Sequence, residues 1–322
     1  MRDVIARVFV ALLACGLAGV AHGQTFPAKA IQLVVPFTPG GGFADRVARL
    51  IADKFRDKWG QPGVVDNRPG ASGNIGGEYV ARAAPDGYTL LVAGDNPLVI
   101  NKTLFPKLSY DPEALTPVSI VIRSPLILVA HPAVPAKNLQ ELLGYAKAHP
   151  DALNLGSNGN GSNMHLSLEL LKRDTGVRIT HVPYKGVPNA LTDLVGGQIQ
   201  LMFVGLGTVL QQLKAGKLKV LAVAGNKRMD ALPDVAAISE TVPGFVTGTW
   251  FGVVAPPKTP PAIAARLSEA ITEMVRSPES IKLFETLSVE GVGATPEETA
   301  KFLKEETARW GQVIRTTGVK AD

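Results

Sequence analysis

Residues 31–57 read IQLVVPFTPGGGFADRVARLIADKFRD. The apolar run at 31–35 predicts a buried strand, and apolar side chains at helical spacing between 47 and 55 predict an amphipathic helix. Three glycines, Gly40 to Gly42, lie between them. Glycine allows positive φ angles and the close approach of a bound group, while a helix start offers unpaired N–H groups and the positive end of its dipole. Such a corner can bind an anion, although many corners of this kind are only tight connections.

The succession of strand, small residues and helix returns three more times. In each case glycine, serine or asparagine residues come just before a predicted helix. Several helix N-termini of this kind suggest a cleft for a small, negatively charged ligand. We number the four segments in chain order as corner 1 (36–45), corner 2 (67–73), corner 3 (155–162) and corner 4 (184–186).

The first 23 residues have the pattern of a secretory signal. Arg2 and Arg7 give a basic start, an apolar stretch follows at 8–20, and Ala21-His22-Gly23 forms a small-x-small cleavage site. An alternative is lipoprotein processing at Cys15. Cleavage after Gly23 would remove Cys15, the chain's one cysteine, and with it any disulfide, thiol nucleophile or thiolate metal site.

The composition of the remaining chain excludes several classes of protein. Removing 23 of the 322 residues leaves 299, roughly two domains' worth. The net charge of the whole chain is only +5 and aromatic residues make up 6% of it, so we expect no nucleic-acid partner. No later stretch reaches the ~18 unbroken apolar residues of a membrane span. The later histidines lack metal-ligand spacing and no phosphate-binding loop motif occurs, so we expect no metal and no cofactor.

Strands and helices alternate along the chain, which predicts an α/β fold with a parallel sheet and helices on both faces. The alternation stops at 94–117, a segment rich in Pro, Asn and Asp that we interpret as a surface connection, and it restarts at the apolar run 126–130. Two α/β lobes that face each other would place the four corners at one cleft. After a predicted strand at 250–255, helices are expected at 261–275, 278–286 and 296–314.

Six segments follow one another in an order that is informative: 31–45 (IQLVVPFTPGGGFAD), 66–76 (DNRPGASGNIG), 156–166 (GSNGNGSNMHL), 181–186 (HVPYKG), 216–224 (GKLKVLAVA) and 250–255 (WFGVVA). Together they resemble the tripartite tricarboxylate transporter substrate-binding family, also called the Bug receptors. The resemblance implies a two-lobed periplasmic binding protein of type II, the Venus flytrap class, with a ligand cleft between the lobes. We expect lobe 1 at 24–122, lobe 2 at 123–255, and a return to lobe 1 with C-terminal helices at 256–322.

The resemblance also implies a binding site. In the family a ligand carboxylate is held largely by backbone N–H groups of the first glycine corner, by Ser and Asn side chains of the second lobe, and by waters. Carried over by motif, the candidate ligand-binding residues are Gly41, Gly42, Phe43 and Asp45 in corner 1, Ser72 in corner 2, Asn158 and Ser162 in corner 3, and Gly186 in corner 4.

Two departures from the family pattern bear on the ligand. Phe43 stands where members often carry a small polar residue, and Val204 stands where many carry an aspartate that could pair with a ligand amine. We therefore expect an organic acid without an ammonium group, with an apolar or aromatic body against Phe43 and Phe203.

Several of these residues also have a purely structural interpretation. Asp45 lies in the first turn of a predicted helix, where a carboxylate complements the dipole and can pair with Arg49 at i,i+4. Ser162 suits an N-cap, and His165 suits a packed or surface position better than a catalytic one. Arg68 and Lys185 could supply positive potential or could be solvated charges.

We therefore predict a periplasmic receptor that captures a di-, tri- or aromatic carboxylic acid by lobe closure and delivers it to an inner-membrane permease of the tripartite tricarboxylate type. We expect a monomer and no enzymatic activity. A ligand-sensing receptor for a signalling partner is one alternative, and a secreted hydrolase is another. The hydrolase is disfavoured because Gly156-Ser157-Asn158-Gly159 lacks the G-x-S-x-G spacing of a nucleophile elbow.

Overall fold

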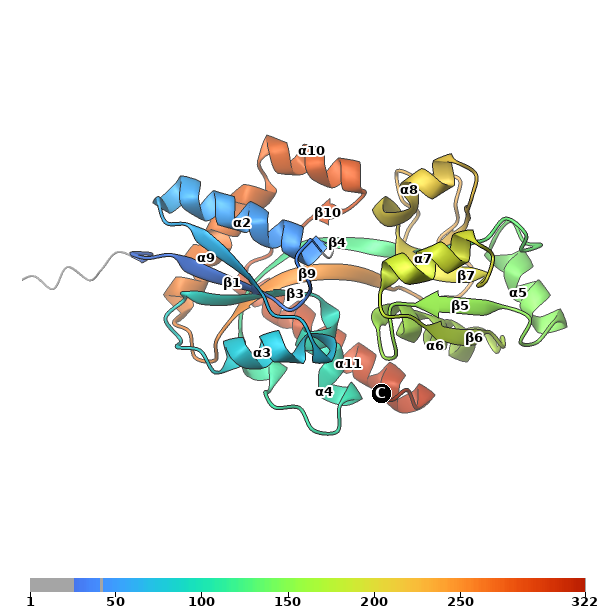
Figure 1. The fold of residues 1–322 in the computed structure, drawn as a ribbon, viewed down its shortest axis with the longest axis horizontal. Helices are drawn as coiled ribbons and strands as arrows, with labels where there is room; N and C mark the ends of the chain where they lie inside the picture. The colour runs from blue at the N-terminus through green and yellow to red at the C-terminus, as the bar shows by residue number, and fades with distance from the viewer. Residues whose placement is uncertain (1–25, 41–42, 322) are drawn as a thin grey trace, which may run out of the picture.

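The computed structural model describes residues 26–40 and 43–321. The predicted signal peptide and two candidate ligand-binding residues, Gly41 and Gly42, lie outside these ranges. Two α/β lobes lie end to end along the longest axis of the molecule, and extended strands run from one to the other (Figure 1). The fold therefore has two lobes, as the sequence predicts.

The sheet of the first lobe is organised around β1, which has a parallel neighbour on each side. β1 (Ile31–Val35) pairs in parallel with β2 (Gly63–Asn67) and with β3 (Thr89–Ala93). β3 then pairs antiparallel with β9 (Gly248–Ala255), and β9 pairs antiparallel with β4 (Thr116–Ala130). The short strand β10 (Glu290–Gly291) closes against β4.

The second lobe begins where β4 changes partners. The later part of β4, from Leu126, pairs antiparallel with β7 (Leu201–Gly205), and from Ile127 it also pairs with β8 (Lys219–Val223). β7 is parallel to β5 (Asn154–Ser157), and β5 is parallel to β6 (Thr180–Pro183). β4 is therefore a single long strand that belongs to both lobes.

The prediction of a parallel sheet is confirmed for β1 to β3 and for β5 to β7, but it is wrong for β4 and β9, which run antiparallel to their neighbours. β4 leads out to the second lobe and β9 leads back, so the two strands that cross between the lobes point in opposite directions. The predicted lobe boundaries remain a prediction. The pairing of Leu91 with Val254 favours a second crossing near Gly248 rather than after Ala255.

Most predicted helices are present within a few residues of their expected ends. The helices that follow a strand or cover the first lobe are α2 (Phe43–Trp59), α3 (Asn74–Ala81), α9 (Pro261–Val275), α10 (Pro278–Leu287) and α11 (Pro296–Thr317). Those of the second lobe are α5 (Leu139–Ala148), α6 (Asn163–Thr175), α7 (Val187–Val195) and α8 (Leu206–Lys214). The short helical turns are η1 (Ala71–Gly73), η2 (Asn96–Ile100), α4 (Asn101–Leu104), η3 (Pro112–Ala114) and η4 (Ile238–Glu240).

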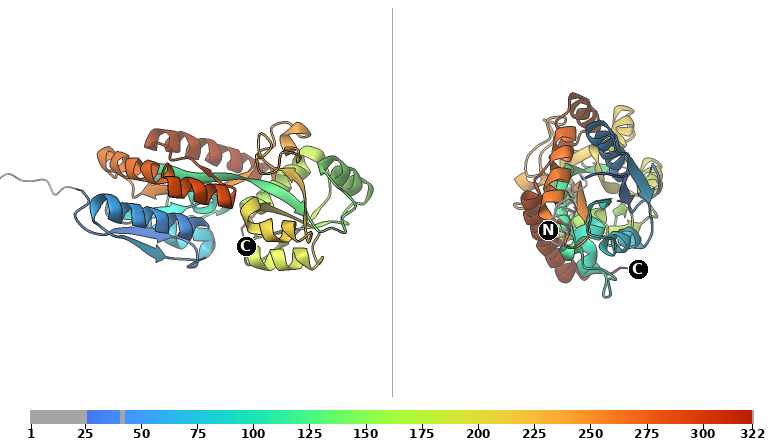
Figure 2. Two further views of the ribbon diagram at one scale, coloured as in Figure 1. Left: turned by 90° about the horizontal axis from the view of Figure 1, so that it is seen from above. Right: turned by 90° about the vertical axis from the view of Figure 1, so that its left-hand side faces the viewer.

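Two hydrophobic clusters hold these elements. One lies in the first lobe and contains the apolar faces of α2 and α9 together with β1. The larger cluster fills the second lobe and continues into the first through η2 and the buried ring of Trp310 in α11. α11 packs against α4, α6 and β4, so it touches both lobes (Figure 2).

The interpretation of 94–117 as a surface connection is wrong for its first half. Leu98, Val99, Ile100 and Leu104 are buried, and the turn η2 packs against α11. The helical spacing of apolar residues in NPLVINKTL favours this packing, but its Pro and Asn residues are also typical of loops. Among the described residues, no helix is both long and apolar enough to cross a membrane.

Candidate functional site

Corners 1 and 2 lie side by side because β1 and β2 are parallel neighbours, with Val35 opposite Asn67. The carboxyl ends of both strands therefore meet at one edge of the sheet. The Asn67 side-chain amide donates a hydrogen bond of 3.0 Å to the Phe37 carbonyl oxygen and another of 3.0 Å to Asp45 Oδ1. Asn67 thus fixes the backbone of corner 1 to corner 2.

Asp45 is buried at the start of α2, and its carboxylate is fully engaged. Arg49 Nε donates to Asp45 Oδ2 at 2.8 Å, which confirms the predicted i,i+4 pair. The hydrogen bond from Arg49, together with that from Asn67, outweighs the effect of burial and holds the pKa of Asp45 below its usual range. These contacts favour the structural interpretation of Asp45, and direct contact with a ligand stays a prediction.

Corner 3 is held together by the hydroxyl of Ser162. Ser162 Oγ accepts a hydrogen bond of 3.3 Å from the backbone N–H of His165 and donates one of 2.7 Å to the Gly159 carbonyl oxygen. The predicted N-cap is confirmed, and Ser162 is buried. The side chain of Asn158, in contrast, is exposed at the tip of the corner.

Corner 4 adjoins corner 3 because β5 and β6 are parallel neighbours. The Tyr184 N–H donates a hydrogen bond of 3.0 Å to the Ser157 carbonyl oxygen, where the two strands end. Gly186 follows as the N-cap of α7. The two glycine corners of the second lobe therefore form one continuous rim.

A chain of asparagine amides joins the corners of the two lobes. Asn101 Nδ2 donates to the Ser72 carbonyl oxygen at 3.0 Å and to Asn74 Oδ1 at 2.6 Å. Asn96 Nδ2 lies 3.3 Å from Asn101 Oδ1 and 3.2 Å from the Gly161 carbonyl oxygen. Corner 2 is thereby connected to corner 3. Sequence analysis missed both Asn96 and Asn101, and their signal was polar residues on an otherwise apolar helical segment.

Asp95 supplies a second contact between the lobes that sequence analysis missed. Asn163 Nδ2, at the start of α6, donates to Asp95 Oδ2 at 2.7 Å and lies 3.3 Å from the Gly248 carbonyl oxygen. Burial of the Asp95 carboxyl, and then the nearby charge of Glu306, raise its pKa to about 7. A carboxyl group that titrates near neutral pH therefore lies where the two lobes meet.

The two predicted aromatic contacts have different surroundings. Phe43 is partly exposed at the start of α2, with its ring centroid 6.3 Å from that of Phe251. Phe203 is 0% exposed, and its ring stacks on that of Phe245 at 6.2 Å. The packing favours Phe43 as a wall of the site and assigns Phe203 to the core of the second lobe.

The remaining candidates are at the surface. Ser72 is exposed and has a φ of 54°, in the left-handed region. Arg68 Nε donates to Asp66 Oδ2 at 2.6 Å and its guanidinium lies 3.5 Å above the ring of Tyr79, so its charge is already paired. Lys185 is exposed beside corner 4.

The contact between Ser157 and His181 resembles the pair that a serine hydrolase uses. Ser157 Oγ lies 2.6 Å from His181 Nε2. However, Ser157 is 0% exposed, and its hydroxyl also bonds to the backbone of Gly159. A nucleophile must be reachable by its substrate, so this contact is better suited to holding corner 3 than to attacking a bond.

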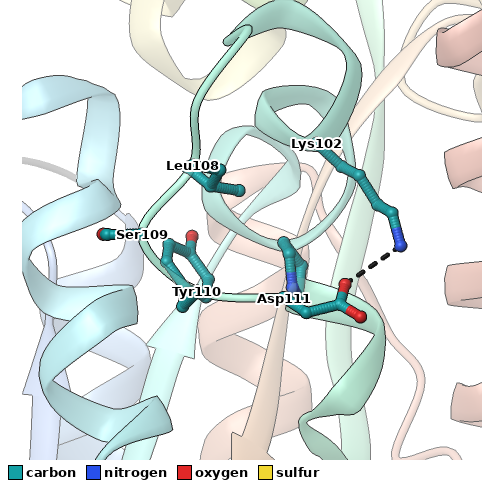
Figure 3. A pocket seen from close by; sticks show the side chains of 6 residues that line it. Lys102, Leu108, Ser109, Tyr110 and Asp111 are labelled. Atoms are coloured by element: carbon teal, nitrogen blue, oxygen red, sulfur yellow. Dashed lines mark hydrogen bonds and ion pairs between the residues drawn. The ribbon is translucent and has the colours of Figure 1, made fainter.

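A separate hollow of about 470 Å³ lies on the first lobe, beside α4 and η3 (Figure 3). Its open rim includes Lys102 and Asp111, which form an ion pair at 3.0 Å. It contains none of the candidate ligand-binding residues, and its lysine is neutralised by its own neighbours. The lining residues are Lys102, Leu108, Ser109, Tyr110, Asp111 and Pro112.

Comparison with known proteins identifies the family. Residues 47–319 match the model of the tripartite tricarboxylate transporter family receptor. The chain belongs to the tripartite tricarboxylate transporter receptor family. Within this receptor family, Protein BugT of Bordetella pertussis is 37% identical over 323 residues, which cover 99% of each chain.

Two solved structures share the fold of this receptor closely. A protein of R. palustris, determined with adipate, is 36% identical, has a TM-score of 0.83, and covers 92% of this chain and 100% of its own. The protein MatC from Rhodopseudomonas palustris, determined with bound malate, is 35% identical, has a TM-score of 0.78, and covers 90% of this chain and 100% of its own. These similarities confirm the predicted family and its two-lobed fold.

Proposed function

We propose that this receptor captures a small organic carboxylate between its lobes and closes around it. The observation that carries the proposal is the connection of the glycine corners across both lobes. Asn67 joins corners 1 and 2, the Asn101–Asn96 pair joins corner 2 to corner 3, and corners 3 and 4 adjoin along β5 and β6. The binding of adipate and of malate by relatives with the same fold supports a carboxylate as the ligand.

Neutral donors are sufficient for such a ligand. Backbone N–H groups at helix starts and amide side chains donate charge-assisted hydrogen bonds worth about 1.5–3 kcal/mol each. Three or four of them give roughly 5–12 kcal/mol before the costs of association are subtracted. A micromolar dissociation constant needs only about 8 kcal/mol, and lobe closure adds apolar contact.

Closure would act through the two strands that cross between the lobes. β4 and β9 are paired along most of their length, so bending near Leu126 and Gly248 would swing the lobes as rigid bodies. A ligand that contacts both lobes favours the closed form in proportion to its preference for that form.

The site favours a dicarboxylate or aromatic acid without an ammonium group. Phe43 and Phe251 provide an apolar surface at corner 1, and the family resemblance implies a carboxylate in many members where this chain has Val204. Adipate and malate, the ligands of the two relatives, are both dicarboxylates. We leave the buried Phe203 out of the proposed contacts.

Membership of the family supports a proposal for the cellular role. We propose that the N-terminal leader directs export to the periplasm, and that the receptor works as a monomer and delivers its ligand to the permease subunits of a tripartite tricarboxylate transporter. Binding and release of an unchanged ligand require no catalytic group.

Isothermal titration with adipate, malate, benzoate and glutamate tests the proposal. Replacement of Gly186 by Val adds bulk at corner 4, where the nearest atom is 3.7 Å from an added Cβ but the φ of +158° is one that L residues rarely adopt. We expect Gly186→Val to fold and to weaken binding at least roughly tenfold, which is about 1.4 kcal/mol. Gly176→Val, at an open position with a φ of +70° at the C-terminal end of α6, is the matched control because it also places Val on a strained backbone. Equal affinity of both variants would remove corner 4 from the site, and tightest binding of glutamate would refute the proposed ligand class.

A further inference from the structure

Two imidazole rings lie stacked directly beneath corner 3. The rings of His165, from α6, and His181, from β6, are parallel within 5°, with their centroids 3.6 Å apart. His165 is buried and His181 is partly buried. Imidazole is the side chain whose ordinary titration falls between pH 5 and 8.

His165 bonds directly to the backbone of the corner, and His181 is linked to it through the hydroxyl of Ser157. The N–H of Gly161 donates a hydrogen bond of 3.0 Å to His165 Nδ1. The N–H of Gly159 donates at 3.1 Å to Ser157 Oγ, and that oxygen lies 2.6 Å from His181 Nε2. Because Ser157 Oγ can donate its one proton to the Gly159 carbonyl oxygen at 3.0 Å, His181 Nε2 is best placed as a donor.

The contact with Gly161 requires a neutral His165. Nδ1 accepts a hydrogen bond only while it carries no proton, so the proton of neutral His165 lies on Nε2. Protonation of Nδ1 would place two N–H groups against each other across 3.0 Å. The Gly161 backbone would then have to move, and with it the corner that contains Asn158 and Ser162.

We propose that His165 is a proton-sensitive positioning residue, and that the ligand-binding shape of corner 3 exists only while His165 is neutral. The inference rests on the proposed function of the corner as part of a carboxylate site. Ligand affinity should therefore fall as pH is lowered through the range where His165 gains its proton, and the limit for one linked proton is about tenfold per pH unit.

Charged and titratable side chains face the pair from the elements packed against it. Glu169, on the same helix, lies 3.7 Å from His165 Nε2, and Lys172 bonds to Glu169 at 2.8 Å. Burial raises the pKa of Glu169, but hydrogen bonds from His165 and Lys172 outweigh it and hold that pKa below its usual range, so Glu169 stays ionised.

From β6, His181 faces the same ring, and two imidazolium rings at 3.6 Å repel each other strongly. The adjacent strands β5 and β7, of sequence NLGS and LMFVG, carry no ionisable side chain. α11 also packs against α6, and its Glu306 and Arg309 bond to each other. Asp95, from the first lobe, bonds to Asn163 in the first turn of α6, and its contribution is the same in the wild type and in a His165 variant.

The first experiment compares pH profiles of affinity. Dissociation constants for adipate and malate are measured from pH 7.5 to 5.5 for the wild type and for His165→Asn. Asn keeps an acceptor oxygen where Nδ1 lies but does not titrate, so titration of the ligand itself cancels in the comparison. We expect the affinity of the wild type to fall roughly 3- to 10-fold more than that of His165→Asn over this range. His181→Gln, which keeps a donor at the position of Nε2, should retain the pH dependence of the wild type. Parallel profiles for the wild type and His165→Asn would overturn the proposal.

The second experiment needs no ligand. Long-range ¹H–¹⁵N spectra of the imidazole rings report which nitrogen carries the proton, and the Gly161 amide signal reports the corner. We expect an unprotonated Nδ1 on His165 at pH 7.5, and a Gly161 amide that shifts with the same midpoint as the His165 ring. A protonated Nδ1 at pH 7.5, or a Gly161 amide that ignores this titration, would contradict the proposal. If the spectra behave as expected but no carboxylate binds at any pH, the proposed function fails while the proton-sensitive corner stands.

Discussion

The side-chain amide of Asn96 donates a hydrogen bond of 3.2 Å to the carbonyl oxygen of Gly161. Asn96 follows β3 in the first lobe, whereas Gly161 belongs to corner 3 of the second. The same amide lies 3.3 Å from Asn101 Oδ1, and Asn101 bonds to the backbone of corner 2. Asn96 and Gly161 are 65 positions apart along the chain, and together with Asn101 this contact connects corner 2 to corner 3.

Replacement of Asn96 by Ala should weaken this link. The variant loses two hydrogen bonds that are partly buried, so we expect a loss of about 1–2 kcal/mol in the free energy of unfolding, measured by urea denaturation. Ligand affinity should fall as well, because corners 2 and 3 are no longer held together. Asn226→Ala, at an exposed turn, is the control and should leave both quantities unchanged. An Asn96→Ala protein with wild-type affinity would show that the amide chain plays no part in binding.

Asp45→Asn should lower stability in a pH-dependent way. The folded pKa of Asp45 is lowered by its bonds to Arg49 and Asn67, so its contribution is present above the unfolded pKa of about 3.9 and is lost as pH falls through the folded pKa. We expect a loss of about 1–2 kcal/mol at pH 7 that narrows at acid pH. Urea unfolding of both proteins at pH 7 and pH 3 measures it. If the difference in unfolding free energy between the two proteins is the same at pH 7 and pH 3, the ionised Asp45–Arg49 pair does not contribute as proposed.

Asp95 should act on stability in the opposite sense. Its folded pKa is raised to about 7, so the folded protein holds an extra proton between the unfolded pKa near 3.9 and pH 7. This contribution makes stability fall as pH rises through that window and level off above it. Between pH 5 and 8 we expect the wild type to lose about 1–3 kcal/mol relative to Asp95→Asn, measured by urea unfolding. Because the comparison is between pH values, any fixed cost of the substitution cancels. If the difference in unfolding free energy between the wild type and Asp95→Asn is the same at pH 5 and pH 8, Asp95 does not titrate in this range.

Gly161→Ala should distort corner 3 for two separable reasons. Gly161 has a φ of +69°, where a side chain costs about 1–2 kcal/mol. In addition, an added Cβ would lie 2.2 Å from Leu104 Cδ2. The double variant Gly161→Ala/Leu104→Ala relieves the contact but creates a cavity, whereas Leu104→Ala alone measures the cavity cost. We expect the effects of the two single substitutions to be non-additive in thermal denaturation, with the double variant more stable than their sum predicts. Strict additivity would show that Leu104 does not constrain the corner.

Much of the site was visible in local sequence. The glycine run before α2 predicted a helix start, and the spacing of Asp45 and Arg49 predicted their ion pair. Ser162 was recognisable as an N-cap. All three features depend on residues within one turn of each other, where helix geometry determines which groups meet.

Features that depend on distant partners were not predictable. Asn96 and Asn101 lie in a segment whose composition is typical of a loop, and their burial depends on α11, about 200 positions later. The direction of β9 was also missed, because hydrophobic periodicity does not encode whether a strand runs parallel or antiparallel. For Phe203, a strand buried on both faces gives no signal of which side chains face a ligand and which face the core.

The most direct test of the central claim is a thermal-shift screen of residues 24–322 against adipate, malate, benzoate and citrate, with 1,6-hexanediol as an uncharged match for adipate. A ligand at about 100 times its dissociation constant adds roughly 2.7 kcal/mol of stability, enough to raise the melting temperature by several degrees. We predict such a rise with one or more of the acids and none with the diol. An unchanged melting temperature with every acid, together with mass spectra of the denatured protein that reveal no co-purified carboxylic acid, would contradict the proposal that this receptor binds a carboxylate.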